Sequence, residues 1–335
     1  MINLTYLLLT SAMAVPSGQL AYAADDGSGG ARVHVVDLAN GEAVAVGPGP
    51  ADGAPVWGPD GAWLAFEAAL EAGEGRGVYV VQADGSGGRF LDHQAAPWNT
   101  EPQWSPGGDR IAYSGGAGLA RRVFVYDLAE DAETVWGGGR EGLLSPVWLD
   151  DETIAAAGLA GTPGRDLSAD IFAVTETGAD QVPLEGGGRR YFEWSLAVNP
   201  QQRETLAFES NDGGYRDIFV ASRDGAFINV SNHRAADWRP QWAPDGQWIA
   251  FESFRSGRVG VHRAHIESLR VHDVAVDAAS DNWGPAWSPD GRWIAYVSGN
   301  GAANRLRIAE VRGDAVHDAP GAGAPVSAPT WRPVP

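Results

Sequence analysis

The sequence lacks cysteine, so disulfide bonds, thiolate metal sites and a cysteine nucleophile are excluded. It also lacks lysine, because all 24 basic residues are arginine. Against 43 acidic residues this leaves a net charge of −19, which makes nucleic acid and anionic membrane surfaces unfavourable partners. Such an acidic protein favours basic or neutral partners instead. Charged residues are only 20% of the chain, which argues against disorder.

Long apolar runs are scarce as well. Residues 1–23 resemble a secretory signal peptide, since the apolar stretch "LTYLLLTSAMAV" precedes the A-x-A-like site "AYA" before Ala24. No basic residue precedes that stretch, which departs from the usual pattern, and the segment is too short and interrupted for a membrane-spanning helix. We expect a periplasmic or extracellular protein, with no membrane insertion beyond this segment.

One motif recurs along almost the whole chain. "PQWAPDGQWIAFES" from Pro240 and "PAWSPDGRWIAYVS" from Pro285 are nearly identical, and weaker copies occur upstream. The copies share an anchor position, normally tryptophan, at Trp57, Trp104, Trp148, Val198, Trp242, Trp287 and Trp331. Successive anchors lie 44 to 50 residues apart, which is close to the length of one four-stranded propeller blade.

Each repeat reads as four β-strands. The "P-x-W" segment is a short inner strand, and "PDG" supplies the residues of a tight hairpin turn in which glycine takes a positive φ. The return strand, "WIAF" or "RIAY", is apolar on consecutive positions, which is typical of a strand buried on both faces. Two further strands follow in each repeat.

The two ends of the chain complete one another. The stretch from Gly18 aligns with the stretch from Gly291 and supplies a second, third and outer strand, whereas "PTW" at residues 329–331 supplies only an inner strand. The sequence therefore predicts an all-β protein with a single propeller over residues 18–335, most simply with seven blades closed by N- and C-terminal strands. Cleavage after Ala23 would remove part of that closing blade, so six blades remain as the alternative.

These repeats resemble the TolB-like, WD-repeat-like β-propeller family. The segment "DIFVASRDGAFINVSNHRAADWRPQWAPDGQWIAFES" follows that family's pattern of an apolar strand ending in D-G, then a polar turn, then P-x-W-S-P-D-G and I-A-F-x-S. The resemblance covers nearly the whole chain and implies the propeller fold. It implies little about function, because many unrelated proteins carry this repeat.

Motifs for catalysis or cofactor binding are not apparent. There is no G-x-S-x-G motif, and we expect no hydrolase domain after the propeller. Among the seven histidines, His262 and His265 are close in sequence, but on a strand they would lie on opposite faces and read as solvated residues. His93 and His233 hold matching repeat positions, which favours a structural role. We therefore predict no catalytic residues, no metal site and no cofactor.

Three acidic residues, Glu67, Glu209 and Glu252, end the second strands of their repeats and would surround one face of the ring. Solvated strand ends are the simpler interpretation of these residues. The loops that lead into the inner strands hold the better binding candidates, because exposed tryptophan beside arginine and acidic residues is typical of partner-binding surfaces. The candidate binding residues are Trp98, Asn99, Glu101, Asp237, Trp238, Arg239, Asp281, Asn282 and Trp283. Packing of each tryptophan against the neighbouring blade is an equally good interpretation.

Two functions from different classes remain open. The first is a non-catalytic scaffold, secreted or periplasmic, that binds a protein or peptide through its loops. The alternative is an enzyme with a site in the central channel, either a polysaccharide lyase or a hydrolase. Propeller enzymes gather polar side chains from several blades, so a missing local motif argues only weakly against the alternative. We favour the scaffold.

Overall fold

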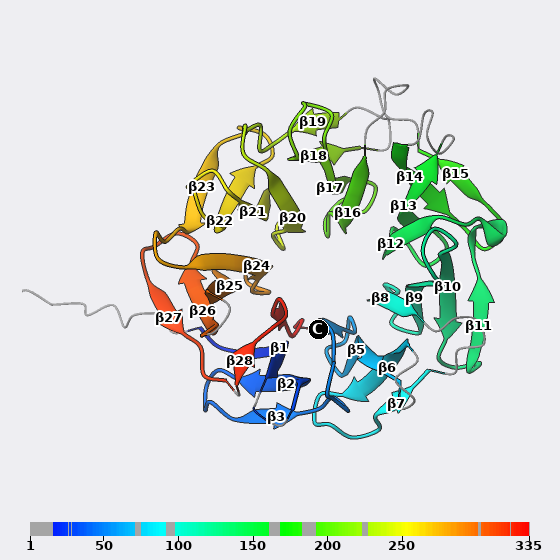
Figure 1. The fold of residues 1–335 in the computed structure, drawn as a ribbon, viewed down its shortest axis with the longest axis horizontal. Helices are drawn as coiled ribbons and strands as arrows, with labels where there is room; N and C mark the ends of the chain where they lie inside the picture. Colours follow the sequence, from blue (N-terminus) through cyan, green and yellow to red (C-terminus); the bar gives the residue numbers. More distant parts are fainter. Residues whose placement is uncertain are drawn as a thin grey trace, which may run out of the picture.

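The computed structural model shows a ring of seven β-sheets around a central axis (Figure 1). It describes residues 16–25, 27, 29–70, 75–91, 98–160, 168–182, 192–222, 227–300, 303–321 and 323–334. Each sheet is a blade whose strands pair antiparallel with their neighbours in sequence. The prediction of seven blades is thus confirmed, and the alternative of six is wrong because the N-terminal strand is present in the closing blade.

Six blades are continuous in sequence, and we number them in chain order. Blade 1 holds β4 (Val56–Trp57), β5 (Trp63–Ala69), β6 (Arg76–Gln82) and β7 (Arg89–Phe90); blade 2 holds β8 (Asn99–Trp104), β9 (Arg110–Gly115), β10 (Arg122–Asp127) and β11 (Ala132–Val135). Blade 3 holds β12 (Leu143–Trp148), β13 (Ile154–Ala160), β14 (Ser168–Val174) and β15 (Ala179–Gln181). A short 3-10 helix, η1 (Gly137–Gly139), precedes blade 3.

The second half of the ring repeats the arrangement with longer inner strands than blade 1. Blade 4 holds β16 (Glu193–Val198), β17 (Leu206–Ser210), β18 (Asp217–Ala221) and β19 (Phe227–Asn229). Blade 5 holds β20 (Asp237–Trp242), β21 (Trp248–Ser253), β22 (Gly260–His265) and β23 (Val271–Ala275). Blade 6 holds β24 (Asp281–Trp287), β25 (Trp293–Gly299), β26 (Arg305–Glu310) and β27 (Val316–Asp318).

The closing blade joins the two ends of the chain. It consists of β1 (Gln19–Asp25), β2 (Ala31–Asp37) and β3 (Ala43–Ala45) from the N-terminal side, with β28 (Ala324–Pro325) and β29 (Thr330–Trp331) from the C-terminal side. Leu20 pairs with Trp331 and Ala21 with Thr330, as the sequence predicts. Residues 1–15, which carry the predicted apolar stretch, lie outside the described residues. Cleavage after Ala23 would remove most of β1, so that cleavage site and this closed ring are incompatible.

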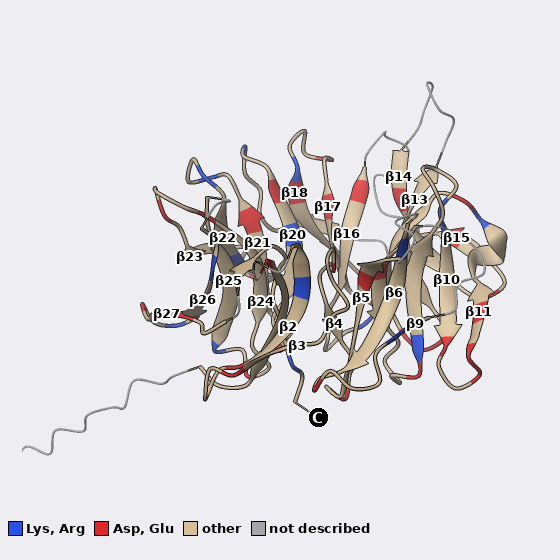
Figure 2. Ribbon diagram, turned by 60° about the horizontal axis from the view of Figure 1, so that its bottom comes forward, with Lys and Arg blue, Asp and Glu red and all other residues tan. Residues whose placement is uncertain are grey.

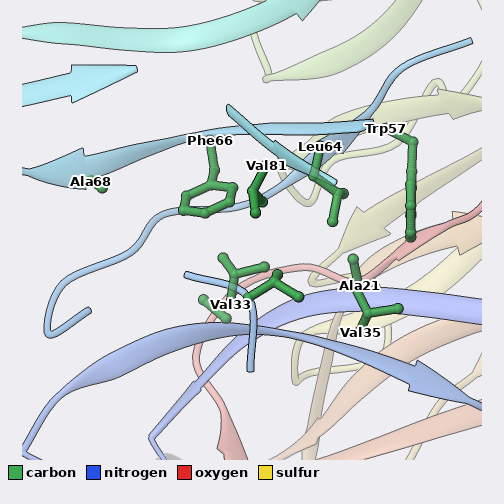
Figure 3. Packing of buried hydrophobic residues seen from close by; sticks show 10 residues of the cluster. Ala21, Val33, Val35, Trp57, Leu64, Phe66, Ala68 and Val81 are labelled. Atoms are coloured by element: carbon green, nitrogen blue, oxygen red, sulfur yellow. The ribbon is translucent and has the colours of Figure 1, made fainter. Parts of the chain in front are cut away.

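The core lies between neighbouring blades. Between the closing blade and blade 1, for example, Val33 and Val35 face Leu64, Phe66 and other buried apolar side chains (Figure 3). Such contacts need both faces of a strand to be apolar, which explains the consecutive apolar residues of β25, where all but the last residue are buried. The "PDG" turns also form as predicted, since Gly246 has a φ of 67° and its N–H donates to Ala243 O at 3.0 Å.

The anchor tryptophans connect each blade to the one before it. The Trp242 indole N–H donates to Ala197 O at 3.0 Å, and Trp287 donates to Gln241 O at 3.1 Å, so each bond reaches the residue just before the preceding anchor. The same bond occurs at the other four tryptophan anchors, Trp57, Trp104, Trp148 and Trp331. These bonds pair the indole donors and hold successive inner strands in register.

Val198 is the one anchor without an indole, and a different side chain joins its blade to blade 3. Arg203, from the longer turn of blade 4, donates from Nε to Leu149 O at 2.6 Å and from one terminal nitrogen to Trp148 O at 2.7 Å. The irregular repeat therefore carries its own replacement for the missing hydrogen bond. The two departures from the repeat pattern are therefore linked: the valine lacks the indole donor, and the longer turn carries the arginine that replaces it.

Candidate functional site

All the predicted binding residues lie on one face of the ring. We call it the loop face, because it carries the loops before the inner strands and the loops between second and third strands; it is uppermost in Figure 2. The two kinds of loop touch, as when Phe254 N–H donates to Ala236 O at 3.2 Å. The opposite face, with the short hairpin turns, is called the turn face.

The structure divides the nine candidates by exposure. Trp98 and Arg239 are exposed, while Glu101, Trp238, Asp281 and Trp283 are partly buried. Asn99, Asp237 and Asn282 are buried, so the structure places these three predicted binding residues beneath the surface. They lie five residues before their anchors, a position that is buried in all three blades.

Asp237 shows what the buried position does. Its carboxylate is fully buried and accepts a hydrogen bond at 2.8 Å from Arg255, which comes from the loop after β21 of the same blade. Burial raises the pKa of Asp237, and Arg255 acts against that rise. The pair ties the start of the inner strand to the neighbouring loop, which is a structural role.

The predicted acidic ring is also structural. Five of the inner strands contain a β-bulge three positions before the anchor. The residue at the bulge has a positive φ, in the left-handed region of backbone conformation. These residues are Glu101, Ser145, Ser195, Arg239 and Gly284. The Glu209 carboxylate accepts from Arg239 N–H at 2.8 Å, and Glu252 accepts from Gly284 N–H at 2.9 Å. Each carboxylate thus holds the bulge of the next blade.

These contacts correct the interpretation of Glu209 and Glu252 as solvated strand ends, because both are buried. Glu67 is half-buried and pairs with Arg76 at 2.7 Å. Glu101, a predicted binding residue, makes a related link from a different position, since it accepts from the backbone and hydroxyl of Ser145 at 2.9 and 3.0 Å.

An aromatic and arginine stack crosses blades 4 and 5 on the loop face. The Arg216 guanidinium lies 5.1 Å from the ring centroid of Trp194 and 5.8 Å from that of Trp238, while its charge is paired with Glu209. The Trp238 ring lies 5.1 Å from that of Phe254, and its indole N–H donates to Glu252 at 2.6 Å. Cation–π contacts and an ion pair with the buried Glu209 carboxylate together fix the Arg216 guanidinium in place.

Sequence reasoning missed Trp194, Arg216 and Phe254. Trp194 lies four residues before the anchor Val198, which is the position of Trp238 and Trp283 in their own blades. The signal was therefore present in the sequence, since Val198 aligns with the other anchors. Trp98, by contrast, lies six residues before its anchor and does not belong to this set.

Exposed aromatic side chains gather on the same face. Within the described ranges, four aromatic residues are exposed, and all four are on loops or strand ends of the loop face: Trp98, Phe192, Tyr215 and Phe254. Exposed large rings cost hydrophobic free energy unless another surface covers them, so their concentration on one face points to binding there.

Glu193 begins the inner strand of blade 4 and is buried near two other carboxylates. Burial, followed by the charges of Asp170 and Asp212, raises its pKa to about 8, against a usual value of 4.5. At neutral pH the folded protein therefore holds Glu193 mainly in its uncharged form, whereas the unfolded chain releases the proton above pH 4.5.

We expect Glu193→Gln to remove a pH dependence of stability. The folded state binds more protons than the unfolded state between about pH 4.5 and 8, so stability falls as pH rises through this window. Glutamine is neutral throughout and fills the same volume, so at pH 8 the variant should be more stable by at least about 1 kcal/mol. Urea unfolding of both proteins at pH 5 and pH 8 measures this. If the free energy of unfolding changes between pH 5 and pH 8 by the same amount in the variant as in the parent, the prediction is wrong.

The structure places His262 differently from the sequence prediction. His262 is fully buried, which corrects its interpretation as a solvated residue, and burial is the main cause that lowers its pKa to about 4. His262 Nδ1 lies 2.9 Å from Asp273, while His265 packs on Trp248, so the two histidines do lie on opposite faces. His233 is exposed and accepts from Ala235 N–H at 3.0 Å, and His93 lies outside the described residues.

Two searches of the described ranges gave negative results. No cluster of three or more His, Cys, Asp or Glu side chains there has the arrangement of a metal site. No helix in those same ranges is long and apolar enough to cross a membrane.

Comparison with known proteins assigns the repeat. Residues 192–334 match the family model described as the TolB beta propeller domain. The matched residues form blades 4 to 6 and the C-terminal strands of the closing blade. The seven blades extend the same architecture over residues 19–331, so the resemblance seen in the sequence is confirmed. A comparison with curated proteins found no match.

Solved structures with a similar fold belong to several kinds of protein. TolB from Acinetobacter baumannii is 16% identical, with a TM-score of 0.61 over 95% of this chain and 68% of that one. The propeller domain of the trilobed protease from Pyrococcus furiosus is 11% identical, with a TM-score of 0.68 over 90% and 95%. An oligogalacturonate lyase from Vibrio parahaemolyticus is 14% identical, with a TM-score of 0.58 over 91% and 85%. At such identities the likeness shows the fold alone.

Proposed function

We propose that this TolB-like propeller is a non-catalytic scaffold that binds a protein or peptide partner through its loop face. The observation that carries the proposal is the gathering of all four exposed aromatic side chains of the described ranges on that face. A rigid ring with variable loops on one face is also the arrangement in which loops usually carry function. Of the predicted residues, Trp98, Arg239, Trp238, Trp283, Glu101 and Asp281 remain candidates for contact.

We also propose a periplasmic or extracellular location, supported by the signal-like sequence of residues 1–23. Because β1 starts at Gln19, a processing site compatible with the closed ring would lie before that residue. Fractionation of producing cells, with N-terminal sequencing of the mature protein, tests both points. A cytoplasmic protein, or a mature chain that begins at Ala24, would contradict them.

The binding proposal predicts that two exposed rings are needed for partner capture. The double variant Trp98→Ser/Phe254→Ser should lose at least about tenfold in captured partner, because exposed aromatic anchors carry much of the binding energy of interfaces. Pull-down from a native extract of the source cells, with captured proteins quantified by mass spectrometry, measures the effect.

Leu269→Ser is the matched control. Leu269 is a similarly exposed apolar residue, but it lies in a hairpin turn on the turn face, so this variant should capture as the parent does. Equal loss in both variants, or none in the double variant, would contradict the role of the loop face. Turnover of a saccharide or ester by the purified protein, abolished by substitutions in the channel, would replace the scaffold by the alternative enzyme.

A further inference from the structure

The loop face over blades 4 and 5 exposes arginines and buries the carboxylates that pair with them. The side chain of Arg239 is 57% exposed and that of its partner Glu252 only 3%; for Arg216 and Glu209 the values are 39% and 0%. Arg255 and Asp237 follow the same order, at 14% and 0%. In a protein with a net charge of −19, this part of the surface therefore presents guanidinium groups to solvent.

The other carboxylates of this region offset that charge only in part, since Asp277 is exposed and Asp212 is partly buried. Asp217 is buried and accepts from Asn229 and Ser231, and Asp281 accepts from Arg258 and from the backbone of Val259. Charges elsewhere on the ring are screened beyond about 8 Å at physiological salt, so the nearby arginines dominate what a bound segment would meet.

The arginines still have donors to offer. A guanidinium has five N–H donors. For Arg239, the only side-chain hydrogen bond to another described residue is the one from Nη1 to Glu252 at 3.3 Å. Arg258, whose side chain is 38% exposed, donates to Asp281 at 3.0 Å from one nitrogen. Exposed guanidinium groups of this kind bind carboxylates with two parallel hydrogen bonds.

Aromatic rings adjoin Arg216 in the same region. Trp194 and Trp238 flank Arg216, and Phe254, which packs on Trp238, is exposed at the edge. The surface thus alternates positive charge with apolar area. A segment that matches it has carboxylates spaced by aromatic or other large apolar side chains.

We propose that this surface binds an acidic peptide segment carrying aromatic or large apolar side chains between its carboxylates. We call the surface the arginine–aromatic patch; it consists of Trp194, Arg216, Trp238, Arg239, Phe254 and Arg258. The inference rests on the proposed function and names the chemistry of its partner. A basic segment would meet exposed guanidinium groups here, and the carboxylates paired with Arg216, Arg239 and Arg255 are only 0–3% exposed, although Asp281 beside Arg258 is 38% exposed. The local surface thus reverses the preference for basic or neutral partners that net charge alone predicts.

Selection from a library of random twelve-residue peptides tests the proposal on the full-length protein. Enriched peptides should be rich in Asp and Glu and contain Trp, Phe, Tyr or Leu. Their affinity is then measured by fluorescence anisotropy. The variant Arg239→Gln/Arg258→Gln should bind them at least about tenfold more weakly, since it removes two charge-assisted contacts. Arg270→Gln, the same change at an exposed arginine in the turn-face hairpin of blade 5, should bind within about twofold of the parent.

The outcomes separate this inference from the proposed function. Enriched peptides that are basic or uncharged, but lose binding in Trp98→Ser/Phe254→Ser, would overturn the acidic partner and leave the loop face intact. Failure to enrich any peptide, or binding unaffected by both double variants, would overturn both. Thermal unfolding of each variant is the control for folding. The arginine variants should unfold at the same midpoint temperature as the parent, because the substituted side chains are exposed.

Discussion

Replacing Trp242 by alanine should lower the free energy of unfolding by about 3–5 kcal/mol. The ring is buried between blades 4 and 5 among Ala207, Val220 and other apolar residues, so its removal leaves a cavity. The substitution also leaves the carbonyl of Ala197 without the indole N–H that it accepts at 3.0 Å. Urea unfolding followed by far-ultraviolet circular dichroism measures the difference.

Trp248→Ala is the matched control for this prediction. Trp248 lies six positions further along the same blade, but it is only partly buried and packs on His265 and Arg263. Its removal should cost about 1 kcal/mol, because the site opens to solvent and no closed cavity forms. If both variants lose the same stability, the anchor tryptophan does not join the blades as we describe.

The second large effect should follow Arg255→Ala, which we expect to cost about 3–5 kcal/mol. The substitution leaves the fully buried carboxylate of Asp237 without its cationic partner. It also removes the hydrogen bond from Arg255 to Ser231 O. The same unfolding measurement applies.

Arg258→Ala provides the comparison, since Arg258 and Asp281 form an ion pair of similar length with both side chains 38% exposed. Solvent already screens that pair, so the loss should be below about 1 kcal/mol. The variant Arg255→Ala/Asp237→Asn should recover part of the stability, because it removes the buried charge. A double variant as unstable as Arg255→Ala would argue against the unpaired carboxylate as the cause.

The fold could be predicted because one motif, in stronger and weaker copies, recurs at a nearly constant spacing along the chain. Each "PDG" turn and each apolar return strand depends on neighbours close in sequence, and even the closing blade follows from aligning Gly18 with Gly291. The replacement of an indole by Arg203 could not be predicted, because that contact joins two blades across 55 residues. No local pattern encodes it.

The candidate site was harder, because exposure alternates from one residue to the next on an inner strand. Asp237 is buried and Trp238 is half-buried, although both belong to the same loop motif. Only the bulge at Arg239, with a φ of 54°, decides which side chains reach the surface. The positive charge of the arginine–aromatic patch could not be predicted from composition either. The sequence shows how many carboxylates there are but not which of them are buried.

The closing blade also makes one step of folding depend on both ends of the chain. Leu20 pairs with Trp331, so the contact that shuts the ring joins residues separated by almost the whole chain. Closing so long a loop is entropically costly and slow, and it must wait until the ribosome has completed the last strand. Until then β1 is an unpaired edge that another chain could occupy.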